Sequence, residues 1–252
     1  MAIINPESVV ILGATSGVAR YIAHEFARLG CALVLAGRDT AEIEILAEDI
    51  HVRFRTPCHV IAFDAAAYDR HGAFVDDCGE ALGAMPDGVV LCFGYMPDQT
   101  RAQAEFDQAR QTIEVNFTGA VSILERFAAV FESRGSGFIA ALSSVAGDRG
   151  RKMNYLYGAS KAGLSAYLQG LRNRLHPAGV RVTTIKPGFM DTPMTMGMKL
   201  PRPLVAAPDK AAQAMTRAIL KGREVAYVPF FWRYIMWIIK SIPEWQFKKM
   251  SI

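Results

Sequence analysis

Two residues able to move a proton, Tyr157 and Lys161, lie four positions apart in the sequence. Residues at i and i+4 share one face of a helix, so a helix here would place the lysine ammonium beside the tyrosine phenol. A nearby positive charge favours the phenolate and lowers a pKa that is ordinarily about 10. A tyrosine tuned in this way can give a proton to a carbonyl oxygen, or take one from an alcohol. The spacing is also common on helix surfaces, so it indicates catalysis only beside a nucleotide site.

A serine pair, Ser143 and Ser144, ends an apolar run upstream of Tyr157. A hydroxyl at this strand end could hold the same substrate oxygen, and the residue types alone leave both serines open. Tyr155 competes with Tyr157 for the proton-transfer role. It lies six positions before Lys161, on a different face of a helix, so Tyr157 is the better candidate.

A nucleotide site is predicted near the N-terminus. Residues 8–12 form a short apolar run, Gly13 to Gly17 form a glycine-rich turn, and residues 18–29 have helical periodicity. A strand, a glycine turn and a helix N-terminus together bind a pyrophosphate. Gly13 permits the tight turn and Gly17 lets the backbone approach the phosphates. The predicted contacts are Gly13, Thr15, Ser16, Gly17 and Val18.

The choice between the two nicotinamide cofactors depends on the end of the second strand. Arg38 follows Gly37 there, and a guanidinium suits a ribose 2′-phosphate. The residues therefore favour NADP(H), with NAD(H) as the alternative. Asp39 keeps that alternative open, because it could neutralise Arg38 or accept a hydrogen bond from a ribose hydroxyl. The pair could also simply begin the next helix.

These motifs, taken together, resemble the short-chain dehydrogenase/reductase family over about residues 7 to 228. The resemblance implies hydride transfer between nicotinamide and a substrate carbon, with no metal. Tyr157 would then move the proton, Lys161 would lower the pKa of Tyr157, Ser144 would hold the substrate oxygen, and Asn116 would support a proton path through water. The offset to the tyrosine in the family favours Ser144 over Ser143. The resemblance also implies that Lys161 holds the nicotinamide ribose and that Tyr157 contacts the cofactor. Further cofactor contacts implied by the resemblance are Asp64, Gly94, Pro187, Gly188 and Thr192.

The pattern of strands and helices predicts an α/β fold. Strand-like runs alternate with helical stretches through all 252 residues, which indicates a single doubly wound Rossmann-type parallel sheet of about seven strands with helices on both faces. The expected strands are 8–12, 32–36, 58–63, 88–93, 137–142, 180–186 and 225–228. Residues 1–228 are assigned to the dinucleotide-binding and catalytic domain, and residues 229–252 to an apolar, aromatic-rich helical tail of the same domain.

The composition and charge of the chain argue against several classes of protein. A net charge of +4 with scattered basic residues does not predict nucleic-acid binding. The four cysteines have neither CxxC pairs nor a secreted framework, and the five histidines have no metal-ligand spacing. The N-terminus shows no secretory signal. We expect a cytoplasmic protein, and the family resemblance implies a homodimer or homotetramer.

The tail is the second informative segment. Residues 225–239 are apolar apart from Arg233, and Lys240, Lys248 and Lys249 follow. A helix over 230–239 would span only about 15 Å, against about 30 Å for a bilayer core. Clustered aromatic residues bounded by basic ones are typical of an interfacial helix, which would allow peripheral contact with the inner face of a membrane. Burial against the body or a second subunit is equally compatible with this pattern.

A narrower resemblance concerns the substrate. The catalytic region and the tail are similar to decaprenylphosphoryl 2-keto-ribose reductases, which implies a polyprenyl-phosphate-linked keto sugar as substrate. Those relatives are associated with NADH, in conflict with the interpretation of Arg38. The alternatives are a general apolar carbonyl or 3-ketoacyl reductase and, as a different class, a catalytically idle cofactor-binding regulator. Residues 190–207, rich in Met and Pro, are expected to form a lid over the site.

Overall fold

The computed structural model describes residues 3–197 and 201–250. The strands are β1 (Ser8–Leu12), β2 (Ala32–Gly37), β3 (Cys58–Ala62), β4 (Gly88–Leu91), β5 (Phe138–Leu142), β6 (Arg181–Pro187) and β7 (Val225–Val228). The α-helices are α1 (Ala19–Arg28), α2 (Thr40–Phe54), α3 (His71–Leu82), α4 (Gln99–Ala104), α5 (Phe106–Ile113), α6 (Gly119–Arg134), α7 (Tyr155–Leu175), α8 (Pro208–Leu220), α9 (Trp232–Ser241) and α10 (Glu244–Phe247). A π-helical turn over Glu114–Thr118 joins α5 to α6.

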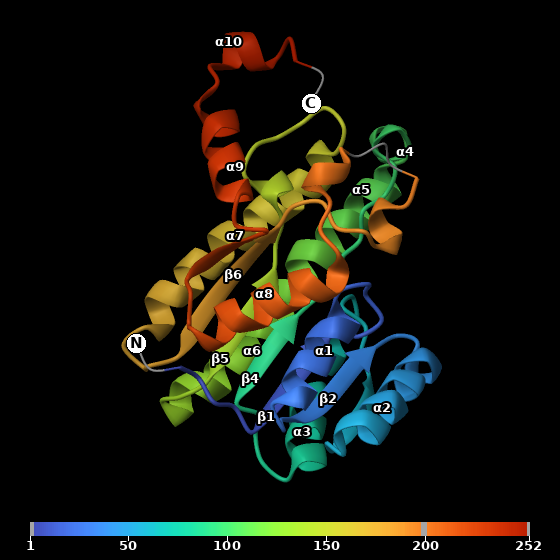
Figure 1. The fold of residues 1–252 in the computed structure, drawn as a ribbon, viewed down its shortest axis with the longest axis vertical. Helices are drawn as coiled ribbons and strands as arrows, with labels where there is room; N and C mark the ends of the chain where they lie inside the picture. The colour runs from blue at the N-terminus through green and yellow to red at the C-terminus, as the bar shows by residue number, and fades with distance from the viewer. Residues whose placement is uncertain (1–2, 198–200, 251–252) are drawn as a thin grey trace.

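The strands form one seven-stranded parallel sheet in the order β3-β2-β1-β4-β5-β6-β7 (Figure 1). The predicted fold class is therefore confirmed. The chain reverses its direction of progress across the sheet between β1 and β4, which are neighbours. In open α/β sheets this switch point, beyond the carboxyl ends of the strands, is where ligands bind.

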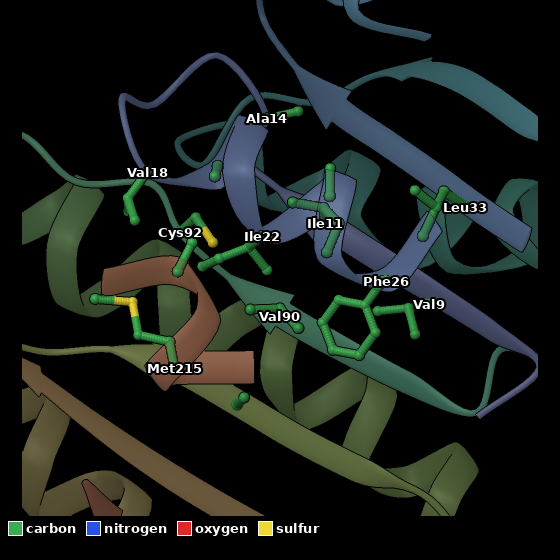
Figure 2. Close-up of a cluster of buried hydrophobic side chains, with 14 of the residues drawn as sticks. Val9, Ile11, Ala14, Val18, Ile22, Phe26, Leu33, Val90, Cys92 and Met215 are labelled. Atoms are coloured by element: carbon green, nitrogen blue, oxygen red, sulfur yellow. The ribbon is translucent and has the colours of Figure 1, made fainter. Parts of the chain in front are cut away.

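Two helical layers cover the sheet. Side chains of α1, α2 and α8 pack on one face, and those of α3, α6 and α7 pack on the other. Both faces of each central strand are apolar, as expected for a buried parallel sheet. Figure 2 shows part of the first layer, where Phe26 of α1 lies over Val9 and Val90, and Met215 of α8 lies near Cys92. This packed core fixes the positions of the strand ends that border the cleft described below.

The strand bounds differ from the predicted ones only at the ends. β3 stops at Ala62 and β4 at Leu91 rather than at residues 63 and 93. Cys92 still donates its backbone amide to Leu12 at 2.8 Å, but Phe93 is free of the β1–β4 ladder. The chain leaves the sheet here because these residues form a wall of the cleft described below.

The tail packs on the body through one face of α9. Trp232 and Met236 are buried in a small cluster with Val145, which follows β5. The guanidinium of Arg149 holds the end of α9 by donating to the carbonyls of Ile239 and Ile242, each at 2.6 Å. In Figure 1, α9 and α10 (red) stand at the end of the molecule away from α2 and α3. The predicted division of the chain after residue 228 stays a prediction.

The opposite face of α9 is apolar and exposed. Tyr234, Trp237 and Ile238 are 62 %, 70 % and 57 % exposed, and Phe230 just before the helix is 74 % exposed. These positions follow the i, i+3, i+4 spacing of one helix face. We call these four residues the outer face of α9. Within the described residues, no helix is both long and apolar enough to span a bilayer.

Candidate active site

A cleft of about 500 Å³ lies at the switch point, bordered by the carboxyl ends of β1, β4, β5 and β6. This volume is within the usual range for a cofactor or small-molecule site. Every residue predicted for the site except Asn116 lines the cleft: Gly13, Thr15, Ser16, Gly17, Val18, Arg38, Asp64, Gly94, Ser144, Tyr157, Lys161, Pro187, Gly188 and Thr192. Among the described residues, no group of three or more His, Cys, Asp or Glu side chains is arranged to hold a metal ion.

The glycine turn is shaped for a ligand to approach its backbone. Gly13 has φ of +80°, and a Cβ there would lie 2.7 Å from Phe93. A Cβ on Gly17 would lie 3.0 Å from Thr192, so the segment after β6 passes directly over the turn. The hydroxyl of Ser16 is buried without a hydrogen-bond partner. A buried polar atom without a partner is costly, so the turn fits a phosphate group that would accept from this hydroxyl.

At the end of β2, Arg38 and Asp39 have different surroundings. Asp39 begins α2, and its carboxylate accepts the backbone amide of Glu42 at 3.1 Å. This is the capping role that the sequence left open. Arg38 is exposed at the edge of the cleft and makes no ion pair with any residue in 3–197 or 201–250. Asp64, at the end of β3, is exposed and accepts the amide of Ala66 at 3.0 Å.

Tyr157 and Lys161 occupy the first turns of α7 on its buried side. They are 9 % and 2 % exposed, and the lysine Nζ lies 5.8 Å from the centre of the tyrosine ring. The ammonium donates a hydrogen bond to the carbonyl of Leu142 at 2.8 Å. Tyr155 is exposed and donates to Gln103 on α4 at 3.3 Å, outside this arrangement.

Burial controls the pKa values of this pair. It raises the pKa of Tyr157 to about 12, and interaction with the hydroxyl of Ser144 acts in the opposite direction. Burial also lowers the pKa of Lys161 to about 8. The sequence predicts that Lys161 lowers the pKa of Tyr157, whereas in the structure burial raises that pKa because it disfavours the charged phenolate.

The geometry separates the two serines. The Ser143 hydroxyl is buried under α7, where it donates to the carbonyl of Lys161 at 3.0 Å and lies 2.7 Å from the Ser165 hydroxyl. Ser144 lines the cleft with an extended backbone, and its hydroxyl accepts the amide of Ala146 at 3.1 Å. Both serines border the cleft, but the hydroxyl of Ser143 is engaged with Lys161 and Ser165, whereas that of Ser144 interacts with Tyr157.

Asn116 lies behind the cleft, in the π-helical turn. Its Oδ1 accepts the amide of Tyr95 at 2.6 Å, and its Nδ2 donates to the Tyr95 carbonyl at 2.8 Å and to the Ser160 hydroxyl at 3.0 Å. Ser160 in turn donates to the carbonyl of Tyr157 at 2.7 Å. Asn116 therefore ties the loop after β4 to the first turn of α7. Sequence reasoning missed Tyr95 and Ser160, although Ser160 lies within the Tyr157–Lys161 segment. Short π-helical turns such as Glu114–Thr118 are frequent at functional sites.

A buried ion pair supports the loop that follows Ser144. The carboxylate of Asp148 pairs with Lys186 of β6 and accepts from the Tyr227 hydroxyl of β7 at 2.7 Å. These contacts join the loop to two strand ends. Nothing in the local sequence indicates them, because the partners are far apart in the chain.

The tail packs behind one wall of the cleft. A Cβ on Gly188 would lie only 1.9 Å from the indole of Trp232, so the chain after β6 packs directly on α9. The expected lid begins here: Met190 and Met194 line the cleft, and Met190 forms a bridge with Ala206. Met198, which belongs to the same expected lid, lies outside the described residues.

Comparison with known proteins places this site in context. The family model for short chain dehydrogenases matches residues 7–202. An uncharacterized oxidoreductase of Mycobacterium tuberculosis is 33 % identical over 242 residues, which cover 96 % of each chain. Another, of Streptomyces coelicolor, is 32 % identical over 251 residues, or 98 % of this chain and 97 % of that protein.

Solved structures share the fold. The short-chain dehydrogenase from Sphingobium yanoikuyae in complex with NADPH aligns with a TM-score of 0.80 at 23 % identity, over 94 % of this chain and 96 % of that one. A 3-oxoacyl-[acyl-carrier protein] reductase with bound NAD from Brucella melitensis aligns with a TM-score of 0.76 at 23 % identity, over 88 % and 89 %.

Proposed function

This chain belongs to the short-chain dehydrogenase family, and from that premise we propose that it reduces a carbonyl group on an apolar, lipid-linked molecule. The observation that carries the proposal is the meeting of Tyr157, Lys161 and Ser144 with the glycine turn in one cleft. A regulator that only binds a cofactor has no need of this arrangement. The test is oxidation of NADPH by the purified protein in the presence of ketones with apolar chains.

Each catalytic residue has a proposed role. Ser144 donates a hydrogen bond to the carbonyl oxygen, and Tyr157 transfers its proton to the same oxygen. The raised pKa of Tyr157 keeps its phenol protonated at neutral pH, the form that can donate a proton to a carbonyl oxygen. Lys161 stabilises the tyrosinate that results. Asn116 positions the first turn of α7 through Ser160.

The residues of the turn fit a nicotinamide dinucleotide. When bound, the reduced nicotinamide would supply the hydride that the carbonyl carbon accepts. The Ser16 hydroxyl and the glycine backbone would hold the pyrophosphate, and Asp64 would lie at the adenine. Gly94, Pro187, Gly188 and Thr192 would line the nicotinamide end.

We propose NADP(H) over NAD(H), because Arg38 has no acidic partner among the described residues and Asp39 is engaged as a helix cap. Arg38→Ala is expected to weaken NADPH binding by about 10- to 100-fold, the usual value of a charge-assisted hydrogen bond, and to leave NADH binding nearly unchanged. Fluorescence titrations with both cofactors measure this. Arg28→Ala, at an exposed arginine paired with Glu25, is the matched control. Equal binding of NADH and NADPH by the wild type would contradict the assignment.

The substrate proposal rests on the tail. Arg233 and Lys240 of α9 are exposed, as are Lys248 and Lys249 after α10, and basic residues together with the outer face of α9 suit a bilayer surface with anionic lipids. The polyprenyl-phosphate-linked keto sugar implied by the sequence resemblance is a molecule of this class. A general apolar carbonyl or 3-ketoacyl reductase remains the alternative, and it needs no membrane contact. The expected cytoplasmic location and the homodimer or homotetramer stay predictions.

Binding to lipid vesicles tests the proposed membrane contact. The wild type is expected to sediment with phosphatidylglycerol vesicles, more weakly at high salt, and the Trp237→Ser/Ile238→Ser variant should lose at least about tenfold in affinity because two large apolar side chains are removed. The matched control is Ile45→Ser/Val52→Ser, at residues equally exposed on α2. If the α9 variant instead changes the mass of the particle in solution, and vesicles bind neither protein, the outer face is a subunit interface.

A further inference from the structure

One cationic side chain at the substrate end of the cleft has no role in the proposed chemistry. Arg151 lies in the loop between Ser144 and α7, and it lines the cleft. Its Nε is buried without a hydrogen-bond partner. One terminal nitrogen of the guanidinium contacts the sulfur of Met236 at 3.0 Å, which is a weak acceptor. The inner face of α9 therefore holds Arg151 against the cleft.

The charge of Arg151 is uncompensated within the described part of the chain. No carboxylate of residues 3–197 or 201–250 forms an ion pair with it. Asp148 is the acidic group that acts on it, yet both carboxylate oxygens of Asp148 are engaged, one by Lys186 and the other by the Tyr227 hydroxyl. Burial lowers the pKa of Arg151. A half-buried guanidinium without a counter-ion is costly, and a ligand anion would remove that cost.

Both apolar and polar side chains line the cleft that Arg151 borders. Val145, Phe189, Met190 and Met194 line the same cleft as Arg151, and Val145 and Phe189 belong to the apolar cluster that contains Met236. Asn154, three positions after Arg151, also lines the cleft, and its side-chain oxygen is buried without a partner. An apolar wall with a few unsatisfied polar atoms is the usual form of a specific small-molecule site.

We propose that Arg151 binds an anionic group of the substrate, a phosphate ester or a carboxylate, while the apolar wall holds the rest of the molecule with its carbonyl at Tyr157. This proposal rests on the reductase function proposed above and adds the charge of the substrate to it. Arg151 is then a specificity residue: it selects anionic carbonyl compounds over neutral ones of equal length.

Calorimetric titration of the NADPH-saturated protein tests the proposal without turnover. The probes are octyl phosphate, octanoate and octanol, which share one chain and differ in the head group. At least one anion is expected to bind more tightly than octanol, and the tighter of the two identifies the anionic group. Arg151→Met should weaken its binding about 10- to 100-fold, the usual value of a charge-assisted hydrogen bond, and leave octanol binding nearly unchanged.

Two further variants make the result specific. Lys152→Met removes a neighbouring exposed positive charge and should have little effect, whereas Arg151→Lys should recover part of the anion binding. NADPH titration of Arg151→Met shows whether the cleft is still folded. Equal affinity of wild type and Arg151→Met for both anions would overturn the proposal. Because the probes are not turned over, failure to reduce any ketone would count against the proposed function alone.

Discussion

Tyr157→Phe is expected to lower kcat for carbonyl reduction by about 10²- to 10⁴-fold, the usual contribution of a positioned general acid. The substitution removes only the hydroxyl, and the ring stays packed in its buried place on α7. NADPH binding should change little, because the glycine turn and Arg38 are untouched. The measurement is steady-state oxidation of NADPH with a ketone that the wild type reduces.

Tyr155→Phe is the matched control, since it removes the same atom two positions away. That hydroxyl donates to Gln103, and neither residue lines the cleft, so its loss should leave kcat within about twofold of the wild type. Comparable losses in both variants would mean that the start of α7 is disturbed as a whole. Full activity in Tyr157→Phe would remove the proposed proton donor.

Lys161→Met is expected to lower kcat by about 10²-fold or more and, at the same time, to remove one pH-dependent contribution to the stability of the fold. The folded protein holds the pKa of Lys161 at about 8, below its ordinary value of 10.5, because burial disfavours the ammonium. The unfolded chain therefore binds more protons between these two values. Measured against the methionine variant, the free energy of unfolding of the wild type should therefore rise with pH across this window.

The size of this effect follows from the two pKa values. Their difference corresponds to about 3 kcal/mol, which the wild type recovers between pH 8 and 10.5 and the methionine variant lacks. Loss of the hydrogen bond to Leu142 adds a cost to the variant that does not depend on pH. Urea unfolding of both proteins across this pH range measures the difference between their free energies of unfolding. A difference that does not change with pH would show that Lys161 carries no buried charge.

The strands of the fold could be predicted because each is a short apolar run between turn residues. β1, rich in valine and isoleucine and followed by Gly13, is such a case, and its bounds match the prediction. The glycine turn and the Tyr157–Lys161 pair are also local patterns, so their placement at one cleft followed once the parallel sheet was assigned.

Other features depend on contacts between distant parts of the chain. Arg149 holds the end of α9, and Asp148 meets Lys186 and Tyr227, through side chains that no spacing rule connects. The pKa of Tyr157 differs from the expectation for the same reason: burial is a property of the packed structure. The π-helical turn at Asn116 has no sequence signal that we could identify.

The inner and outer faces of the short helix α9 have different roles. Its inner residues Trp232 and Met236 back Gly188 and Arg151, while its outer face is the surface proposed for lipid. Shortening the chain after β7 is therefore not a neutral way of making the protein easier to purify. A truncation that removed the exposed aromatic side chains would also remove the residues that pack behind the cleft. A truncated protein that is easier to handle would therefore have an altered active site.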